Sequence, residues 1–265
     1  MTRICIAGAT GWTGRALVDG ALAADDLELR SAVARSTAGQ DLGAALGREP
    51  LGVPIHAAVG AAALDGVDAL IDYTSPDAVK DNALAAIEQG AGVVIGTSGL
   101  TAADFDDIDA AARRRGVGVI AAGNFSLTAA MAQAAALLAA RHLPQWEVID
   151  YASAGKADVP SGTARELAER LATVRAPAAA QPPDAVAGPR EARGATIGGS
   201  QVHSLRLPSF VVSTEVVFGL PDERLSIRHD AGASAVPYVA GTLLAVRALA
   251  RTEGLVRGLD TLLLG

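Results

Sequence analysis

Cysteine is nearly absent from this chain of 265 residues, because Cys5 is the single one. An intrachain disulfide is therefore excluded, and a reducing compartment is indicated. The N-terminus leads directly into an apolar segment without the layout of a signal peptide, so we expect a cytoplasmic protein. Cys5 lies within that segment and is expected to be a small buried side chain.

Clusters of positive charge and long apolar runs are also missing. The net charge is −7, and the short run Arg113–Arg115 lies near an expected helix end, where cations are favourable, so no nucleic-acid partner is expected. The longest apolar helical stretch, around residues 127–140, is too short to cross a bilayer, so no membrane partner is expected. Half of the residues are hydrophobic and 19% are charged, which is typical of a globular α/β protein with room for two modest domains.

A glycine-rich turn lies close to the N-terminus. Residues 3–7 predict a strand, the turn GATGWTG follows as Gly8-x-x-Gly11-x-x-Gly14, and residues 15–24 predict a helix. This order is the context of a dinucleotide-binding fingerprint, in which glycines permit a tight turn and close approach of a pyrophosphate. The turn residues expected to contact the cofactor are Gly8, Thr10, Gly11, Trp12, Thr13 and Gly14.

The end of the second expected strand, residues 29–33, bears on the choice of cofactor. Enzymes that use NAD usually place an acidic residue there for the ribose hydroxyls, but this chain has Ala34 followed by Arg35. Arg35 could pair with the 2′-phosphate of NADPH, or it could be an ordinary surface arginine. We expect NADPH to be the cofactor, with NADH as an alternative.

Further strands at 69–73, 92–95 and 117–121 alternate with helical stretches and predict a doubly wound parallel sheet. Ligands of such sheets bind beyond the carboxyl ends of the strands, where small and hydroxylic residues cluster in this chain. The residues expected there, around a nicotinamide, are Tyr73, Thr74, Gly96, Thr97, Ser98, Gly123, Asn124 and Phe125.

A second domain is expected after residue 124. An alanine-rich helix and a strand at 147–152 come first, residues 175–193 read as an exposed loop, and three β-rich runs follow near 201–207, 210–219 and 224–229. These runs predict a smaller α+β domain with an open mixed or antiparallel sheet, one face on helices and the other free to meet a partner subunit. We expect a dinucleotide-binding domain at 1–124 plus 232–265 and a substrate-binding and oligomerisation domain at 125–231.

The stretch GKADVPSGTA at residues 155–164 combines a lysine with the start of an amphipathic helix. Ser161, Gly162 and Thr163 would offer backbone N–H groups and hydroxyls at a helix N-terminus, where the dipole favours an anion, and Lys156 adds a full positive charge. The pattern is that of a carboxylate or phosphate site. An ordinary capped helix beside a surface lysine would look the same in sequence. No metal site is expected.

With these motifs placed, the chain resembles the dihydrodipicolinate reductase family over essentially its whole length. The residues that carry the resemblance are GATGWTG, IDYTSP at 71–76, GTSG at 96–99, AGNFS at 122–126 and, above all, the K-x-D-x-P-S-G-T-A signature at 156–164. The resemblance implies a homotetramer or homodimer and hydride transfer from NAD(P)H to a cyclic unsaturated imine dicarboxylate of lysine biosynthesis. It also implies that Ser98, Lys156, Ser161, Gly162 and Thr163 hold this small carboxylate substrate.

The chain departs from the family at the proposed proton donor. The family carries two adjacent histidines in an E-x-H-H segment, where this chain has Asp150-Tyr151-Ala152-Ser153, and a later strand has also lost its histidine. Neither His203 nor His229 falls on a missing position. Loss of a general acid costs roughly 10²–10⁴ in rate. We expect either a substitute acid, with Tyr151 and Lys156 the nearest catalytic candidates and Ser153 beside the substrate, or a substrate whose imine nitrogen is already protonated. The second alternative, a diverged imine reductase, is favoured.

Two other functions were weighed. A short-chain dehydrogenase would space its tyrosine and lysine as Y-x-x-x-K on one helix face, whereas Tyr151 and Lys156 are five residues apart on an expected strand and turn. A non-catalytic NADP-binding protein would explain the lost histidines, but it would have no use for the intact lysine and SGTA segment. We therefore expect an NAD(P)H-dependent oxidoreductase.

Overall fold

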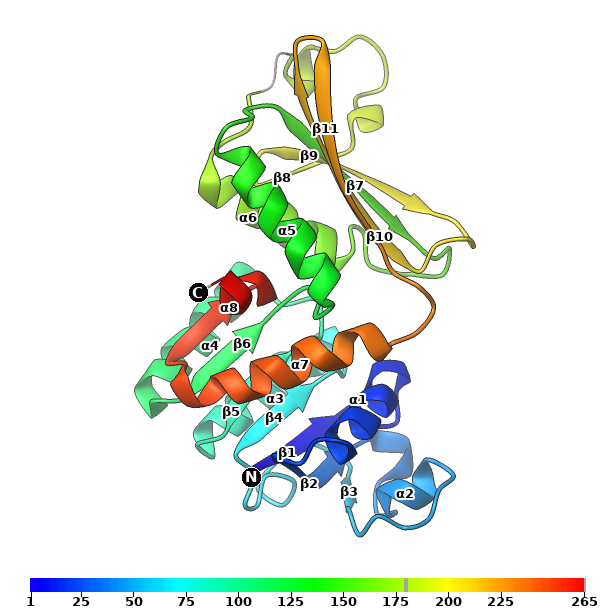
Figure 1. The fold of residues 1–265 in the computed structure, drawn as a ribbon, viewed down its shortest axis with the longest axis vertical. Coiled ribbons are helices and arrows are strands. Elements are labelled where there is room, and N and C mark those ends of the chain that lie inside the picture. Colours follow the sequence, from blue (N-terminus) through cyan, green and yellow to red (C-terminus); the bar gives the residue numbers. More distant parts are fainter. Residues whose placement is uncertain (179–180, 265) are drawn as a thin grey trace. The chain divides into compact units, whose positions relative to one another are not determined.

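The structure is a computed structural model that describes residues 1–178 and 181–264. The chain forms two compact units, one of residues 1–127 together with 235–265 and one of residues 128–234 (Figure 1). The junctions at 127 and 235 lie three residues later than the expected junctions at 124 and 232. A C-terminal segment thus returns to the first unit.

The first unit is built on a parallel sheet of seven described strands, which confirms the predicted fold class. The strands are β1 (Thr2–Ala7), β2 (Leu27–Val33), β3 (Ile55–His56), β4 (Ala69–Asp72), β5 (Gly92–Ile95), β6 (Gly118–Ala121) and β12 (Gly254–Arg257). Their order is β12-β6-β5-β4-β1-β2-β3, and every neighbouring pair is parallel. The direction of winding reverses between β1 and β4, which is the point where open α/β sheets bind their ligands.

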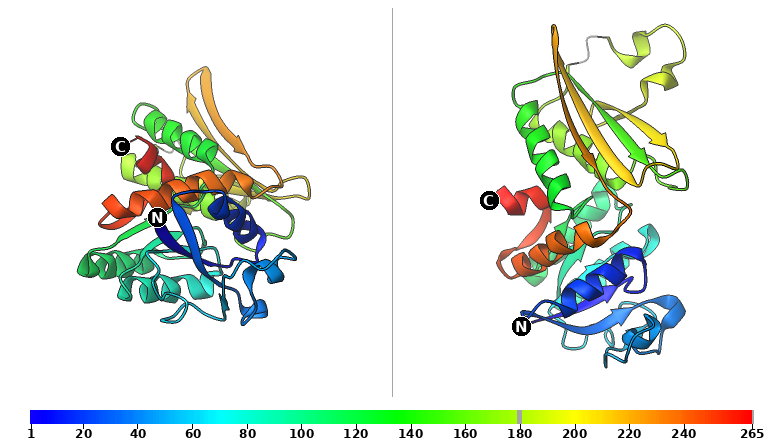
Figure 2. Two further views of the ribbon diagram at one scale, coloured as in Figure 1. Left: turned by 60° about the horizontal axis from the view of Figure 1, so that its bottom comes forward. Right: turned by 45° about the vertical axis from the view of Figure 1, so that its right-hand side comes forward.

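Helices cover both faces of this sheet. They are α1 (Trp12–Leu22), α2 (Leu42–Ala45), α3 (Pro76–Glu88), α4 (Ala102–Arg115), α7 (Val236–Ala248) and α8 (Leu259–Leu264). α3 and α4 pack together on one face, where their alanine, valine and isoleucine side chains join the sheet core, and α1 packs against α7 (Figures 1 and 2). α4 shows why the local sequence forms a helix, because Thr101 and Asp104 make a capping box and Gly116 ends the helix in a left-handed conformation.

The C-terminal tail adds an element that its sequence does not predict. The tail was expected only to return to the first domain, but residues 254–257 form β12, which extends the parallel sheet beside β6. The Asp109 carboxylate accepts a hydrogen bond of 2.7 Å from the backbone N–H of Leu255 and so ties α4 to this edge strand. Four residues are too few to show a periodicity, so the strand depends on this tertiary contact.

Among the described residues, the second unit consists of a mixed five-stranded sheet and two helices. The strands are β7 (Trp146–Ala152), β8 (Ala195–Ile197), β9 (Ser200–Arg206), β10 (Val212–Leu220) and β11 (Glu223–Asp230), and the helices are α5 (Leu127–Ala140) and α6 (Gly162–Val174). The order is β11-β10-β7-β9-β8, with β7 and β9 parallel and the other pairs antiparallel. The predicted three β-rich runs correspond to β9, β10 and β11.

One face of this sheet packs against the two helices, and the other face points away from them. Trp146, Val148, Val216 and Phe218 form a core with leucine and alanine side chains of α5 and α6. Along β7 burial alternates, so Glu147, Ile149 and Tyr151 point away from those helices. The segment 175–193, expected to be a loop, holds two short turns, Pro183–Ala185 and Arg190–Arg193, and residues 179–180 within it lie outside the described residues.

Candidate active site

The glycine turn after β1 is shaped for close approach of backbone to backbone. Gly8 has a positive φ of 84°, and a Cβ there would lie 2.1 Å from the carbonyl oxygen of Tyr73. A Cβ on Gly14 would lie 2.0 Å from the carbonyl oxygen of Gly8. Neither position accepts a side chain, so α1 can begin directly against the strand. The turn therefore fits a pyrophosphate at the N-terminus of α1.

The other residues of this turn also have defined places. Arg15 donates from Nε to the carbonyl oxygen of Thr10 at 3.0 Å, which holds the turn against the first turn of α1. Trp12 is exposed and meets Tyr238 edge to face, with ring centroids 5.8 Å apart. Thr13 is half-buried. An exposed indole beside the turn is available to contact a ligand.

Arg35 begins a short 3-10 turn, Arg35–Thr37, directly after β2. Its side chain is exposed and makes no ion pair with any residue that the structure describes. The preceding Ala34 is buried and carries no carboxylate for a ribose diol. The backbone N–H of Gly8 donates to the carbonyl oxygen of Val33 at 2.9 Å, so the end of β2 adjoins the glycine turn. The free guanidinium is therefore close to the place where a bound dinucleotide would pass.

Asp72, at the carboxyl end of β4, joins two of the expected cofactor segments. Its buried carboxylate accepts from Thr74 N–H at 3.0 Å and Oγ1 at 2.8 Å, from Thr97 Oγ1 at 2.6 Å and from Asn82 Nδ2 at 2.8 Å. Thr97 Oγ1 also accepts from the backbone N–H of Thr74 at 2.8 Å. This network holds the ends of β4 and β5 together, and its central residue was not among the expected site residues.

Two expected cofactor residues have aromatic rings that pack within the first unit, Tyr73 half-buried and Phe125 buried. Tyr73 lies against Gly96, where a Cβ would be 2.1 Å from the ring, and its hydroxyl is 3.0 Å from Oγ1 of Thr242 on α7. Burial raises the pKa of Tyr73. Phe125 is buried, with its ring centroid 6.2 Å from that of Tyr73. The Tyr73 hydroxyl and the contact between the two rings tie the ends of the strands to α7 and to the segment after β6.

The remaining expected residues of the first unit lie at strand ends. Ser98 is half-buried after β5, Gly123 is exposed after β6, and Oδ1 of Asn124 accepts from the backbone N–H of Ser126 at 2.8 Å. Together with Thr74 and Gly96 they follow parallel strands whose carboxyl ends share one edge of the sheet. The structure thus collects the predicted cofactor residues at that edge.

In the second unit, Asp150 organises the loop that carries the lysine. Its carboxylate is fully buried and accepts from Ser161, at 3.0 Å from the backbone N–H and 2.6 Å from Oγ. Ser204 Oγ donates to it at 3.1 Å, and Arg206 Nη2 donates at 2.9 Å. The same nitrogen of Arg206 donates to the carbonyl oxygen of Asp158 at 2.7 Å. Arg206 neutralises the buried charge, and both ends of the loop are fixed to the sheet.

Ser161 is the N-cap of α6, as its position in the motif predicts. Its Oγ accepts from the backbone N–H of Ala164 at 3.3 Å, while its own N–H is held by Asp150. Gly162 and Thr163 form the first turn and are half-buried. Through its hydrogen bonds from Ser161, Asp150 holds the N-terminus of this helix in one orientation.

Lys156 lies in the loop between β7 and α6. Its Nζ is 2.8 Å from Oδ1 of Asp158, and its backbone N–H donates to the carbonyl oxygen of Ser153 at 3.0 Å. An ammonium group has three donors, so two of them remain for a ligand. The side chain is thus held near the start of α6 with capacity to bind an anion.

At the two positions where the family is expected to have histidines, this chain has an apolar residue and a small polar residue. Ala152 is fully buried at the end of β7, on the same face as Asp150, and Ser153 is half-buried at the start of the loop. The backbone N–H of Ser153 donates to the carbonyl oxygen of Val211 at 3.3 Å, and its carbonyl oxygen accepts from the backbone N–H of Lys156. Neither side chain can act as a general acid near neutral pH.

Tyr151, expected as a candidate proton donor, lies on the opposite face of the sheet from Ala152. It points to the face of the sheet opposite Asp150 and Ala152, donates to Glu215 Oε2 at 2.9 Å and packs against Phe210, with ring centroids 5.0 Å apart. Burial and the bond to the Glu215 carboxylate raise its pKa. The two-residue period of a strand accounts for the difference, because neighbours in sequence lie on opposite faces.

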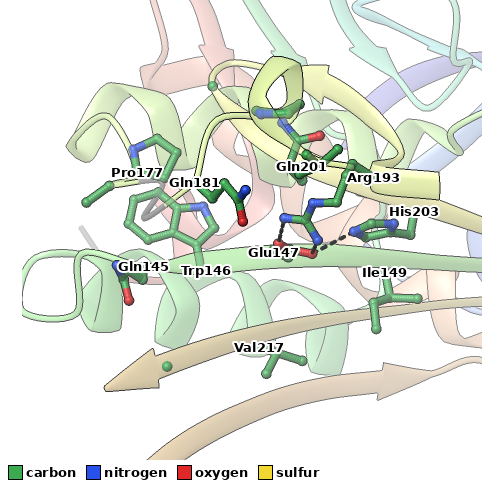
Figure 3. A pocket seen from close by; sticks show the side chains of 15 residues that line it. Gln145, Trp146, Glu147, Ile149, Pro177, Gln181, Arg193, Gln201, His203 and Val217 are labelled. Atoms are coloured by element: carbon green, nitrogen blue, oxygen red, sulfur yellow. Dashed lines mark hydrogen bonds and ion pairs between the residues drawn. The ribbon is translucent and has the colours of Figure 1, made fainter. Parts of the chain in front are cut away.

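A hollow of about 660 Å³ lies on that same outward face (Figure 3). Glu147 forms its polar centre, with an ion pair to Arg193 and a contact of 2.7 Å to Nε2 of His203. Burial acts to raise the pKa of Glu147, but Arg193 and His203 outweigh it and lower that pKa. Ile149 and Val217 add apolar surface beside this cluster. Sequence analysis did not identify this cluster, since Arg193 and Glu147 are joined only by the fold.

In residues 1–178 and 181–264 no helix is long and apolar enough to cross a membrane. Within the same ranges no group of three or more His, Cys, Asp or Glu side chains is arranged to hold a metal ion.

The class of this protein is that of a nicotinamide-dependent oxidoreductase built from two units. It combines a glycine-rich turn, an edge of small and hydroxylic residues, and a lysine in the loop before a capped helix. Two family models match, dihydrodipicolinate reductase N-terminus over residues 2–125 and dihydrodipicolinate reductase C-terminus over residues 123–263. The chain belongs to the dihydrodipicolinate reductase family.

Individual relatives agree over the whole length. The chain is 39% identical over 264 residues to a 4-hydroxy-tetrahydrodipicolinate reductase from Moorella thermoacetica, covering 98% of this chain and 97% of that protein. It is 36% identical over 270 residues to a protein of the same name from Synechococcus elongatus, covering 98% of each. Among solved structures, dipicolinate-bound dihydrodipicolinate reductase from Paenisporosarcina sp. TG-14 matches with a TM-score of 0.76 and 27% identity, covering 98% of this chain and 99% of that one.

Proposed function

We propose that this protein reduces a cyclic imine carboxylate with hydride from NADPH, in a reaction of the dihydrodipicolinate reductase type. The observation that carries the proposal is the loop between β7 and α6, in which Asp150 and Arg206 fix the helix cap at Ser161 and Asp158 holds Lys156. A protein that only sensed a dinucleotide would not need such an arrangement.

The first unit is proposed to bind the cofactor. Gly8, Gly11 and Gly14 leave room for the pyrophosphate, and the unpaired Arg35 can donate two parallel hydrogen bonds to a 2′-phosphate. The ends of β4 and β5, joined by Asp72, would line the nicotinamide end. When bound, the nicotinamide supplies the hydride. The residues of this chain orient it and keep the segments at Thr74 and Thr97 in place.

The second unit is proposed to hold the substrate carboxylate. Lys156 offers two free N–H donors, and the first turn of α6 offers the backbone N–H groups and the hydroxyl of Thr163 at the positive end of the helix dipole. Ser98 of the first unit and Ser153 remain further candidates for substrate contact. Lys156 would orient the substrate and neutralise its charge.

Ala152 and Ser153 favour a substrate that needs no protein acid at the reacting imine. An iminium whose nitrogen is already protonated accepts hydride at carbon and yields a neutral amine directly. In this reaction no carbanion forms, so no general acid is needed to protonate one. We therefore favour a protonated cyclic imine as the natural substrate.

A second candidate is the reaction named for the relatives, 4-hydroxy-tetrahydrodipicolinate reduction. The identity of 39% over the whole chain favours it. It would require a substitute proton donor, and Lys156, whose Nζ lies 2.8 Å from Oδ1 of Asp158, is the candidate supported by its position in the motif. Such an enzyme would belong to lysine biosynthesis.

The experiment that tests the proposal is NADPH consumption by the purified protein against a panel of cyclic imine carboxylates, with dihydrodipicolinate included. We expect turnover of at least one cyclic imine acid and no turnover of the matched imine that lacks a carboxylate. Equal rates with and without the carboxylate would contradict the proposed site at Lys156.

We further propose that the protein is a homotetramer or homodimer that associates through the outward face of the second sheet. The face bears the apolar side chains of Ile149, Val217 and Leu205 around the Glu147–Arg193–His203 cluster. An exposed sheet face with apolar side chains and a polar cluster is suited to an interface.

A further inference from the structure

A small cavity of about 20 Å³ lies within the second unit, between α5, α6, β10 and β11. Most of its wall is alanine, leucine, valine and isoleucine, and its polar lining consists of Gln133, Thr163, Thr214 and His229. Thr163 is one of the residues proposed above to hold the substrate carboxylate. The cavity therefore adjoins the first turn of α6 from inside the unit.

Two polar atoms in this wall lack a hydrogen-bond partner among the described residues. They are Oγ1 of Thr214, whose residue is 6% exposed, and Nδ1 of His229. The other ring nitrogen of His229 is 3.1 Å from Oγ1 of Thr128, which fixes the ring. A buried polar atom is almost always paired, and a cavity above about 10–15 Å³ can hold one water. A single bound water would satisfy both atoms.

The strand register connects this pair to the loop that carries Lys156. Thr214 of β10 pairs with Asp150 on one side and with His229 of β11 on the other, so the three side chains form a row on the face that meets α5 and α6. Asp150 holds the cap of α6 at Ser161. His229 is thus the titratable end of a polar row that passes beneath the carboxylate site.

The surroundings of His229 make its charge sensitive to a nearby anion. Burial lowers the pKa of His229, and Asp230 on the same strand acts in the opposite direction. The cavity walls contributed by α5, α6 and β10 carry no charged side chain, and the buried Glu166 of α6 does not line the cavity. A carboxylate bound at Thr163 would therefore be a strong new influence, and it would favour the imidazolium.

We propose that His229, with a water held between its Nδ1 and Thr214 Oγ1, is a positioning residue of the carboxylate site and takes up one proton when a dicarboxylate binds at Thr163. This inference rests on the proposed function. No bond of the ligand changes in this step, because solvent supplies the proton and the imidazole nitrogen receives it. Protonated His229 donates through both nitrogens and fixes the water toward Thr163.

The test is calorimetry of pyridine-2,6-dicarboxylate binding to the NADPH-bound protein near pH 7, in buffers of different ionisation enthalpy. The wild type should take up a substantial fraction of one proton per ligand, and uptake should be greatest midway between the pKa of His229 in the free protein and its pKa in the complex. His229→Gln, which keeps a side-chain donor toward Thr128, should bind with no uptake and lose about three- to tenfold in affinity at pH 6. Thr214→Val should reduce uptake while leaving NADPH affinity unchanged.

His203→Gln is the matched control, because His203 lies on the outward face and should leave proton uptake unchanged. Uptake that persists in His229→Gln would overturn this inference alone. Failure of the wild type to bind the dicarboxylate would contradict the proposed function and this inference together. A crystal structure should show one water within hydrogen-bond distance of Nδ1 and Oγ1, and a dry cavity would overturn the water site.

Discussion

At the scale of single residues, we propose that Arg35 and Lys156 bind anions, because each has N–H donors that no described residue occupies. Arg35 has no described ion-pair partner, and Lys156 shares its ammonium with Asp158 alone. Other arginines form ion pairs, as Arg3 does with Asp68 and Arg247 does with Asp26. A free cation at a strand end keeps its hydrogen-bonding capacity for a ligand.

Replacing Arg35 should change the choice of cofactor. We expect Arg35→Ala to weaken NADPH binding by about 1.5–3 kcal/mol, the contribution of a charged hydrogen bond, and to leave NADH binding nearly unchanged. Fluorescence titration of both cofactors measures this. Arg30→Ala, on the same strand β2, serves as a control. Equal affinity of the wild type for both cofactors, unaltered by the substitution, would show that the arginine is an ordinary surface residue.

Replacing Lys156 should affect the substrate and spare the cofactor. Lys156→Ala should raise KM for a cyclic imine carboxylate by about ten- to a hundredfold, which corresponds to about 1.5–3 kcal/mol. NADPH affinity should stay within about twofold. Lys80→Ala is the matched control, because Lys80 is paired with Asp104 and Asp107 in the first unit. An unchanged KM would place the carboxylate elsewhere.

At the scale of elements, buried aspartates connect segments that are distant in sequence. Asp72 joins the ends of β4 and β5, and Asp150 joins β7, β9 and the start of α6. Each accepts several hydrogen bonds within one rigid sheet edge. Both carboxylates thereby hold in position the backbone that we propose to bind the ligands.

Asp72→Asn should loosen the cofactor edge. The amide replaces one acceptor by a donor that faces other donors, so at least one of Thr74, Thr97 or Asn82 loses its partner. We expect a loss of about 1–3 kcal/mol in the free energy of unfolding and a higher KM for NADPH. Urea unfolding and cofactor titration measure the two effects. Asp68→Asn, which removes an exposed pair with Arg3, should cost about 0–1 kcal/mol, and an equal cost for both variants would argue against the network.

The sequence predicts most elements because hydrophobic periodicity and glycine turns are local signals. The helices at 76–88 and 102–115 and the Ser161 cap follow from short-range patterns. The role of Asp150 does not, because it depends on Arg206, which lies 56 residues away in sequence. The face of the sheet on which the Tyr151 side chain lies is predictable from the two-residue alternation along its strand. β12 depends on its partner strand and carries no periodicity of its own.

At the scale of the whole molecule, association is expected through the outward face of the second sheet. Leu205, 37% exposed, pairs with Tyr151 on that face, and Leu225, 42% exposed, pairs with Phe218 on the other face. Leu205→Glu should shift the protein toward a smaller species because it places a charge within the interface. Light scattering after size exclusion measures the mass. Leu225→Glu is the matched control, and equal behaviour of both variants would contradict this interface.

The chain belongs to the family but lacks the expected histidine pair, and these two facts together raise the question of its natural substrate. The two-unit fold, the glycine turn and the lysine segment agree with the family over the whole chain. Ala152 and Ser153 stand where the family is expected to carry its histidine pair. We therefore propose that the preferred substrate carries its own proton on the imine nitrogen.

The most direct measurement is kcat for dihydrodipicolinate and for a protonated cyclic imine carboxylate, in the wild type and in the double variant Ala152→His, Ser153→His. The wild type should reduce the iminium with a kcat that shows no histidine limb near pH 6.5, and it should reduce dihydrodipicolinate poorly. The double variant should gain on dihydrodipicolinate and stay unchanged or slower on the iminium. Wild-type turnover of dihydrodipicolinate at about 10 s⁻¹ or more would contradict the account, because a different acid would then be at work.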